Sequence, residues 1–237
     1  MKLSVVMPVY NERQWIEKII DKVLKQKIPG INGLEIVIVD DGSKDGTREI
    51  IYGLANKYPQ AIFPVFHEKN SGKGSAVRSG IKNIKGDICI IQDADLEYDP
   101  ADYPIVLGPI IEGKADCVYG SRFMGSQPKR VLFFWHYVGN RVITLLSNMF
   151  TNLNLTDIET GCKAFRADVI KSLPIQSRDF GFEPEITARI AKKGCRVYEA
   201  GISYSGRTYQ EGKKIGWVDG IKAIGTILKY GIFLRRT

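Results

Sequence analysis

The chain has 237 residues, of which 44% are hydrophobic and 25% are charged. These values fit one globular domain of ordinary size, and they exclude an intrinsically disordered chain. The formal net charge of +8 is uneven, because residues 117–156 contain no acidic residue and basic residues dominate after Glu211. Clustered basic charge favours contact with phosphates, anionic lipid headgroups or nucleic acid, although a solvated basic face would give the same composition.

Neither a membrane-spanning nor a secreted class is indicated. No run approaches the roughly 18 apolar residues of a spanning helix, and no signal peptide opens the chain. The cysteines form no CxxC pair and have no metal-ligand spacing, which predicts a reducing compartment. We therefore expect a cytoplasmic protein that lies on the membrane surface if it meets a membrane.

Apolar runs and helical periodicity alternate through the first half of the chain. Strands are predicted at residues 3–9, 34–39, 62–66, 87–92 and 117–119, and helices at 16–24, 45–57, 75–84 and 103–111. Asn11 is a candidate cap for the first helix. This order predicts an α/β fold with a mostly parallel central sheet and helices on both faces.

The second half is less regular. Helices are predicted at residues 132–152, 183–193 and 216–230, and a strand at 196–203. We expect one domain over residues 1–210, followed at 211–237 by a basic amphipathic helix without a transmembrane segment. This helix and the aromatic cluster at 133–135, beside Lys129 and Arg130, could attach the protein to a membrane interface, or both could be ordinary core helices.

Carboxylates follow the fourth predicted strand directly. Asp93 and Asp95 are two residues apart, and Glu97 lies two residues further on. Bringing such charges together is unfavourable unless a cation or a hydrogen-bond donor neutralises them. Hard oxygen ligands suit Mg²⁺ or Mn²⁺ bridging a diphosphate, although a solvated turn before Asp99 is the simpler alternative.

Polar loops follow other strands at the same predicted sheet edge. After the second strand, Asp41 is read as a ligand residue for a base or ribose, and Asp45 as a structural helix cap. Residues 70–75 open a helix, where glycines, the helix N-terminus and Lys73 could favour an anion; a merely flexible helix start is the alternative. His67 and His136 have no partner at ligand spacing, so neither is expected to bind a metal.

Basic residues follow the fifth strand. Arg122, together with Lys129 and Arg141, could gather phosphates, because guanidinium groups bind them through two hydrogen bonds. Arg130 adjoins the aromatic cluster and is expected to contact lipid headgroups or solvent. No GxSxG motif or catalytic triad is present in the sequence, so acyl hydrolysis has no support.

Taken together, these segments resemble family-2 glycosyltransferases, which have the GT-A nucleotide-binding fold. The matching segments are VVMPVYNE (5–12), VDDGSKDGT (39–47), NSGKG (70–74), QDADL (92–96) and GSR (120–122). The nearest subgroup is that of dolichyl-phosphate mannosyltransferases and polyprenyl-phosphate glucosyltransferases. The resemblance covers about residues 3–210. Many members of this subgroup continue into membrane helices, whereas this sequence ends at Thr237.

The resemblance implies roles for individual residues. Those matching the donor-nucleotide site are Pro8, Tyr10, Glu12, Asp41, Lys73, Asp93 and Ala94. Asp95 and Glu97 match the metal positions. Asp93, Arg122 and Arg141 match catalytic positions, the arginines holding donor or acceptor phosphate. The segments TGCKAFR (160–166) and FEPE (182–185) resemble the acceptor side, which includes Lys163, Arg166 and Glu183.

The resemblance thus implies an inverting transferase that moves a hexose from a UDP- or GDP-sugar to a polyprenyl phosphate. It would act with Mg²⁺ or Mn²⁺ at the cytoplasmic membrane face, with a separate membrane subunit as a possible partner. A phosphate acceptor is already ionised and needs no strong base, whereas a hydroxyl acceptor would need one such as Asp93 or Glu183.

Three alternatives remain. The first is a family-2 enzyme that acts on a sugar or glycolipid hydroxyl in cell-envelope polysaccharide synthesis. The second is a sugar nucleotidyltransferase, although the segment after the first strand lacks that class's glycine-rich loop. The third is a non-catalytic binder of anionic lipid or nucleic acid. Nucleic acid is not expected, because the aromatics cluster in a predicted helix rather than on a basic sheet face. The sequence does not distinguish the sugar, the nucleotide or the metal.

Overall fold

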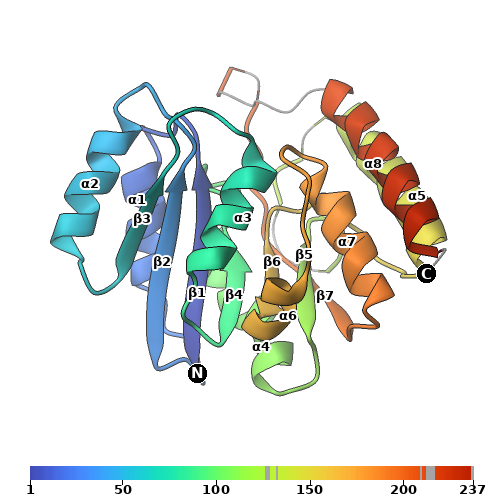
Figure 1. Ribbon diagram of the computed structural model, residues 1–237, viewed down its shortest axis with the longest axis horizontal. Coiled ribbons are helices and arrows are strands. Elements are labelled where there is room, and N and C mark those ends of the chain that lie inside the picture. Colours follow the sequence, from blue (N-terminus) through green and yellow to red (C-terminus); the bar gives the residue numbers. More distant parts are fainter. Residues whose placement is uncertain (126–128, 132, 209, 212–216, 236–237) are drawn as a thin grey trace.

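The computed structural model describes residues 1–125, 129–131, 133–208, 210–211 and 217–235. Within these residues, strands form a seven-stranded sheet in the order β3-β2-β1-β4-β6-β5-β7 (Figure 1). The strands are β1 (Lys2–Val9), β2 (Gly33–Asp40), β3 (Ile62–Phe66), β4 (Ile88–Ile91), β5 (Cys117–Ser121), β6 (Lys163–Arg166) and β7 (Val197–Gly201). Three of the basic residues after Glu211 lie outside the described residues, namely Lys213, Lys214 and Arg236. The predicted first residues of two helices, Leu132 and Gly216, also lie outside them.

The sheet is parallel except for β6, which pairs antiparallel with both β4 and β5. The sequence predicts the parallel pairs but not β6, because this strand is four residues long and begins and ends with a charged side chain. The antiparallel direction of β6 determines which of its residues reach the site. Lys163, the first residue of β6, pairs with Ile91 at the end of β4, so the start of β6 reaches the edge where the parallel strands end.

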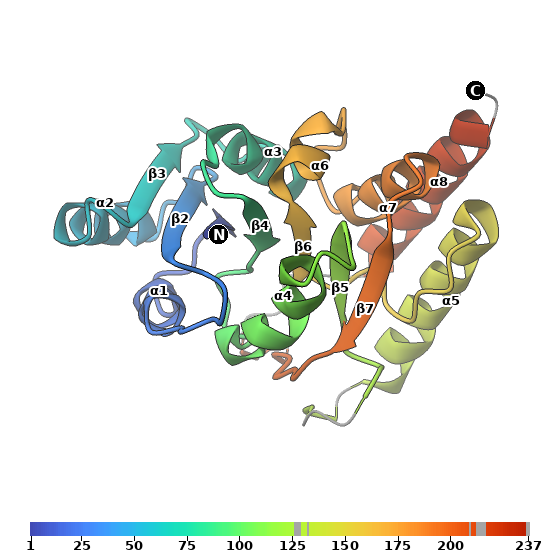
Figure 2. The same cartoon turned by 90° about the horizontal axis from the view of Figure 1, so that it is seen from below.

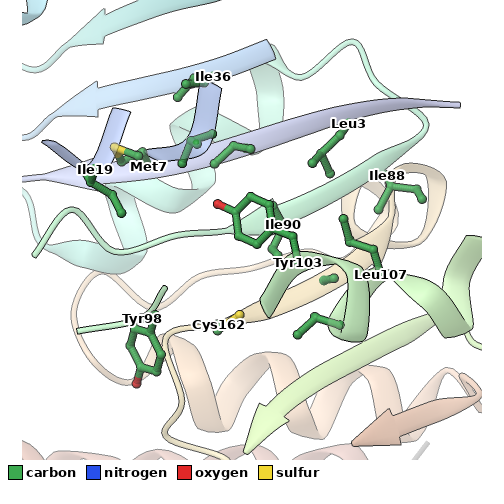
Figure 3. Close-up of a cluster of buried hydrophobic side chains, with 14 of the residues drawn as sticks. Leu3, Met7, Ile19, Ile36, Ile88, Ile90, Tyr98, Tyr103, Leu107 and Cys162 are labelled. Carbon is green, nitrogen blue, oxygen red and sulfur yellow. The ribbon is translucent and has the colours of Figure 1, made fainter. Parts of the chain in front are cut away.

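Helices cover both faces of the sheet (Figure 2). They are α1 (Ile16–Leu24), α2 (Thr47–Lys57), α3 (Lys73–Asn83), α4 (Tyr103–Ile111), α5 (Phe134–Thr151), α6 (Ala167–Ser172), α7 (Phe182–Lys192) and α8 (Trp217–Arg235), with a 3-10 turn at Pro100–Asp102. One apolar core lies between the sheet and α1 and α4; it includes Leu3, Ile19, Ile90 and Tyr103 (Figure 3). The second core lies on the other face and receives side chains from α3, α6, α7 and α8.

Helix α8 packs against α7 and α5, and Ala223 and Ile227 from α8 lie in the second core. Among the described residues, no helix is both long enough and apolar enough to cross a membrane.

The first helix begins later than its predicted cap. Asn11 has a left-handed backbone with φ of 54°, and α1 starts only at Ile16. The Asn11 side-chain oxygen accepts a hydrogen bond from the Lys44 backbone N–H at 2.9 Å. Asn11 therefore joins the loops after β1 and β2 instead of capping a helix. Asp45 has a structural role, since it accepts hydrogen bonds from the backbone of Arg13 and Thr47, but the N-cap of α2 is Gly46.

Candidate active site

Most of the predicted site residues lie along one edge of the sheet. Parallel strands end there, so the segments after β1, β2, β4 and β5 meet at this edge. Pro8 ends β1 with Val9, and the half-buried Tyr10 and the buried Glu12 follow it. Ala94 is buried between Asp93 and Asp95 directly after β4.

An acidic cluster at this edge surrounds the guanidinium of Arg207. The guanidinium Nη2 lies 2.8 Å from Asp95 Oδ2, Nε lies 3.2 Å from Glu97 Oε1, and Nη1 lies 3.4 Å from Glu12 Oε2. The Arg207 backbone N–H also donates to Glu97 Oε1 at 3.0 Å. The structure thus brings together the acidic residues that follow β1 and β4, around a cation that follows β7.

Negative charge is in excess at this edge. Burial, together with the charges of Asp93 and Glu97 and against the opposing charge of Arg207, raises the pKa of Asp95 to about 7. Within the described residues, no group of three or more His, Cys, Asp or Glu side chains is placed to hold a metal ion alone. Mg²⁺, however, commonly binds through one or two carboxylates together with substrate phosphates. The hard oxygens of Asp95 and Glu97 fit such a shared site.

Lys73 joins the acidic edge to helix α7. Its ammonium lies 3.0 Å from Asp93 Oδ1 and 3.1 Å from Glu183 Oε1. Burial alone would lower the pKa of Lys73, but the charges of the two carboxylates raise it above its usual value. Lys73 is therefore a fixed cation between Asp93 and a buried glutamate.

The glycines around Lys73 serve packing against a neighbouring loop. A Cβ at Gly72 would lie 2.3 Å from the carbonyl oxygen of Arg178, and a Cβ at Gly74 would lie 2.5 Å from that of Ser177. The Ser75 N–H already donates to the Arg178 carbonyl at 3.0 Å. The structure thus gives these glycines a packing role, and the anion cradle stays a prediction.

The carboxylate of Asp41 is hydrogen-bonded to other residues of the chain. Its oxygens accept from the N–H groups of Ser71 at 3.0 Å and Gly72 at 2.8 Å, and His67 Nδ1 lies 2.6 Å from Oδ1. These contacts occupy both carboxylate oxygens and fasten the loop before α3 to the end of β2. In this structure Asp41 shapes the edge, and His67, which the sequence did not link to any carboxylate, is its partner.

Arg122 is held by a buried carboxylate that the sequence did not reveal. Its Nε and Nη2 lie 2.6 and 2.7 Å from the two oxygens of Asp157, and Nη2 lies 3.2 Å from Asn140 Oδ1 on α5. Burial would lower the pKa of Arg122, but the charge of Asp157 raises it. The exposed Arg141, one residue after Asn140, donates to the Thr156 carbonyl at 3.5 Å.

The start of β6 adds a buried charged group. Lys163 donates to the Thr160 carbonyl, and burial lowers its pKa while Glu183 opposes that shift. Burial raises the pKa of nearby Glu159, and the charge of Glu183 raises it further. Among the described groups, Glu159 Oε1 and Glu183 Oε2 are buried without a hydrogen-bond partner.

Arg166 does not join the other predicted acceptor residues. It pairs with Ile88 at the beginning of β4, which places it at the opposite edge of the sheet. There it is exposed and binds Asp168 through two hydrogen bonds, at 3.1 and 2.8 Å. The predicted place of Arg166 on the acceptor side is therefore corrected. Because β6 runs antiparallel, its last residue lies far from the edge that Lys163 reaches.

Asp93 lies directly against the backbone that leads into β6. A Cβ at Gly161 would lie 2.0 Å from Asp93 Oδ2 and 2.9 Å from Cε2 of Tyr98. The Gly161 N–H donates to the Tyr98 hydroxyl at 2.9 Å. Gly161 is thus required for Asp93 to occupy its position.

Comparison with known proteins agrees with this architecture. The profile of Glycosyl transferase family 2 matches residues 4–173. The chain belongs to this family. A solved structure of glucosyl-3-phosphoglycerate synthase from Mycobacterium tuberculosis, in complex with Mn²⁺, UDP and phosphoglyceric acid, is similar over 97% of this chain and 78% of that chain. Its TM-score is 0.73 at 22% identity, and the expected GT-A fold is confirmed, with a mixed sheet.

Curated relatives of this family-2 chain include two enzymes of lipid-linked sugar chemistry. A dolichol-phosphate mannosyltransferase of Pyrococcus furiosus is 30% identical over 91% of this chain and 60% of its own length. An undecaprenyl-phosphate mannosyltransferase of Micrococcus luteus is 27% identical over 99% of this chain and 96% of its own length. The chain therefore spans less than two thirds of the first relative and nearly all of the second.

Proposed function

We propose that this protein transfers a hexose, with inversion, from a UDP- or GDP-sugar to a polyprenyl phosphate at a membrane surface. The observation that carries the proposal is the arrangement of charged side chains at this edge of the sheet. Carboxylates suited to a metal–diphosphate lie on one side of it, and the basic pair Arg122 and Arg141 lies on the other. The names of the two mannosyltransferase relatives support a lipid phosphate as acceptor.

Asp95 and Glu97 would hold the divalent ion. When bound, Mg²⁺ or Mn²⁺ supplies positive charge that stabilises the departing nucleoside diphosphate. Solved structures of glucosyl-3-phosphoglycerate synthase from Mycobacterium tuberculosis, which is similar in fold, contain Mn²⁺ or Mg²⁺ with UDP and support this choice of ion. Asp93, fixed by Lys73 and by contact with Gly161, would orient the donor sugar beside it.

In the proposed reaction, one acceptor phosphate oxygen bonds to the anomeric carbon as the bond to the leaving phosphate breaks. Arg122, whose side chain is fixed by Asp157, would orient the acceptor phosphate, and Arg141 adds charge beside it. The acceptor is an anion at neutral pH, so no proton has to be removed. The two candidate bases, Asp93 and the buried Glu183, are both ion-paired with Lys73. This pairing favours an acceptor that needs no base.

The surface formed by α5 and α8 supports a membrane location. The two helices lie side by side at one end of the molecule (Figures 1 and 2). Along α5, exposed apolar side chains recur at helical spacing: Phe134 and Trp135 are 65% and 77% exposed, and Val142 and Leu145 are 46% and 60% exposed. Residues 117–156 carry no acidic side chain, so this apolar stripe has a basic setting that suits anionic lipid.

A transfer assay tests the reaction class. Radiolabelled UDP- and GDP-sugars are incubated with polyprenyl phosphate, with and without EDTA, and label is measured in the organic extract. We expect metal-dependent lipid label with the native protein and none with Asp95→Asn. Asp168→Asn, which changes a carboxylate at the opposite sheet edge, is the matched control and should transfer normally. Full transfer in EDTA, or by Asp95→Asn, would contradict the metal assignment.

Vesicle sedimentation tests the membrane surface separately. Leu145→Glu should reduce binding to vesicles that contain phosphatidylglycerol, whereas Ile105→Glu, at an exposed apolar position on α4, should not. Equal binding by both variants would contradict the assignment of the α5 surface.

A second acceptor class is favoured by one observation. Glu183 Oε2 has no hydrogen-bond partner among the described residues, so this oxygen could accept a proton from a sugar or glycolipid hydroxyl. In that case, metal-dependent hydrolysis of the donor would occur without label in the lipid extract, and added glycolipid acceptors would restore transfer.

A further inference from the structure

Arg207 occupies the centre of the acidic edge and is firmly attached there. Its segment is tied to Glu97 by the Ser205 N–H, which donates to the Glu97 carbonyl at 2.9 Å, and by the Tyr204 hydroxyl, which donates to Glu97 Oε2 at 2.9 Å. The Arg207 side chain is only 12% exposed, and the side chains of Glu12, Asp95 and Glu97 are 9, 16 and 13% exposed. The guanidinium is therefore shielded from bulk water by the residues that it contacts.

The oxygens that Arg207 uses are those that a divalent ion would need. Nη2 binds Asp95 Oδ2 at 2.8 Å, and Nε binds Glu97 Oε1 at 3.2 Å. A divalent ion on these oxygens would lie within a few ångströms of the guanidinium, and like charges at that distance repel strongly in a partly buried site. The guanidinium and the ion therefore compete for the same carboxylates.

We propose that Arg207 is a counterion within the protein that weakens binding of the bare metal ion to Asp95 and Glu97 until the nucleotide diphosphate binds. In the free protein, the guanidinium neutralises the carboxylates that would otherwise attract the ion. When a metal–diphosphate enters, its phosphate charge offsets the guanidinium, and the ion can take the carboxylate oxygens. This inference rests on the metal site of the proposed function and adds an order of binding, in which metal and nucleotide enter together.

A supporting role and a competing role for Arg207 predict opposite changes in metal affinity when the guanidinium is removed. If the guanidinium served to hold Asp95 and Glu97 in position for the ion, removing it would weaken metal binding. If it is a competing counterion, removing it leaves the same carboxylates with more negative charge and strengthens metal binding. The direction of the change in affinity for the bare ion therefore distinguishes the two roles without an activity measurement.

The experiment measures Mn²⁺ binding to the full chain by electron paramagnetic resonance, with no nucleotide and with UDP or GDP. We expect Arg207→Gln to bind bare Mn²⁺ at least about tenfold more tightly than the native protein, a change of about 1.4 kcal/mol. Arg207→Lys, which keeps the charge, should lie closer to the native protein. Arg196→Gln is the matched control, because Arg196 pairs with Asp116 at the opposite sheet edge and should not alter binding.

Unchanged or weaker binding of bare Mn²⁺ by Arg207→Gln, in a variant whose circular dichroism matches that of the native protein, would overturn the counterion role. If the native protein still binds Mn²⁺ with UDP or GDP in that case, the metal site of the proposed function stands. If neither the native protein nor Arg207→Gln binds Mn²⁺ with either nucleotide, the metal site and the counterion role both fall.

Discussion

Gly161→Ala is expected to displace Asp93. The added methyl group would lie 2.0 Å from Asp93 Oδ2, whereas ordinary contacts of a Cβ atom are 3.4–4 Å, so the carboxylate or the loop must move by more than about 1 Å. Displacing a reacting group by about 1 Å can reduce the rate about 100-fold, which corresponds to about 2.7 kcal/mol in activation free energy. Overpacking of this kind also lowers the free energy of unfolding by about 1–3 kcal/mol.

Two assays separate these effects, namely sugar transfer at saturating donor and unfolding in urea. Gly53→Ala is the control, because the added Cβ on α2 meets no atom within 4 Å; it should leave transfer unchanged and stabilise the helix by about 0.5–1 kcal/mol. The double variant Asp93→Ala/Gly161→Ala should recover part of the lost stability, since the clash has been removed. Native stability and native transfer in Gly161→Ala would refute the reasoning.

Three further outcomes follow from the charged groups. Lys73→Met leaves the buried Glu183 and the half-buried Asp93 without their counter-charge and should lower the free energy of unfolding by about 3 kcal/mol in urea titrations. Hydrogen bonds from Arg196 lower the pKa of Asp116 from 3.8 to about 2, so this surface pair should contribute a small stabilisation above pH 4. That contribution is lost as the pH falls toward 2, and the stability difference between the native protein and Asp116→Asn should disappear there. Asp157→Asn should loosen Arg122 and reduce transfer about tenfold or more while leaving Mn²⁺ binding unchanged.

The sequence predicted those parts of the site that follow directly from strand order. An unbroken apolar run followed by polar residues marks the end of a parallel strand, and this rule brought Glu12, Asp95 and Arg122 to one edge of the sheet. Arg207 was missed although the same rule applies to it, since it follows the predicted strand that became β7. The signal was present, but a single arginine after a strand does not reveal which carboxylates it will contact.

Other features depend on contacts between distant segments. Asp157 lies in a loop without a local pattern, and only the fold brings it to Arg122. His67 is 26 residues from Asp41, and no spacing rule connects a histidine to a carboxylate at that separation. Arg166 was misplaced because the direction of β6 cannot be read from four residues, and direction alone decides which edge of the sheet its ends reach.

The position of the reversed strand also determines which parts of the chain supply the two sides of the site. At the acidic edge, Glu12 follows β1, Asp95 and Glu97 follow β4, and Arg207 follows β7. Arg122, Asn140 and Asp157 come from the single segment between β5 and β6, and Lys163 begins β6. On the proposed assignment, one continuous segment of the chain thus carries the arginines that hold the acceptor phosphate, and exchanging this segment between relatives should alter acceptor choice.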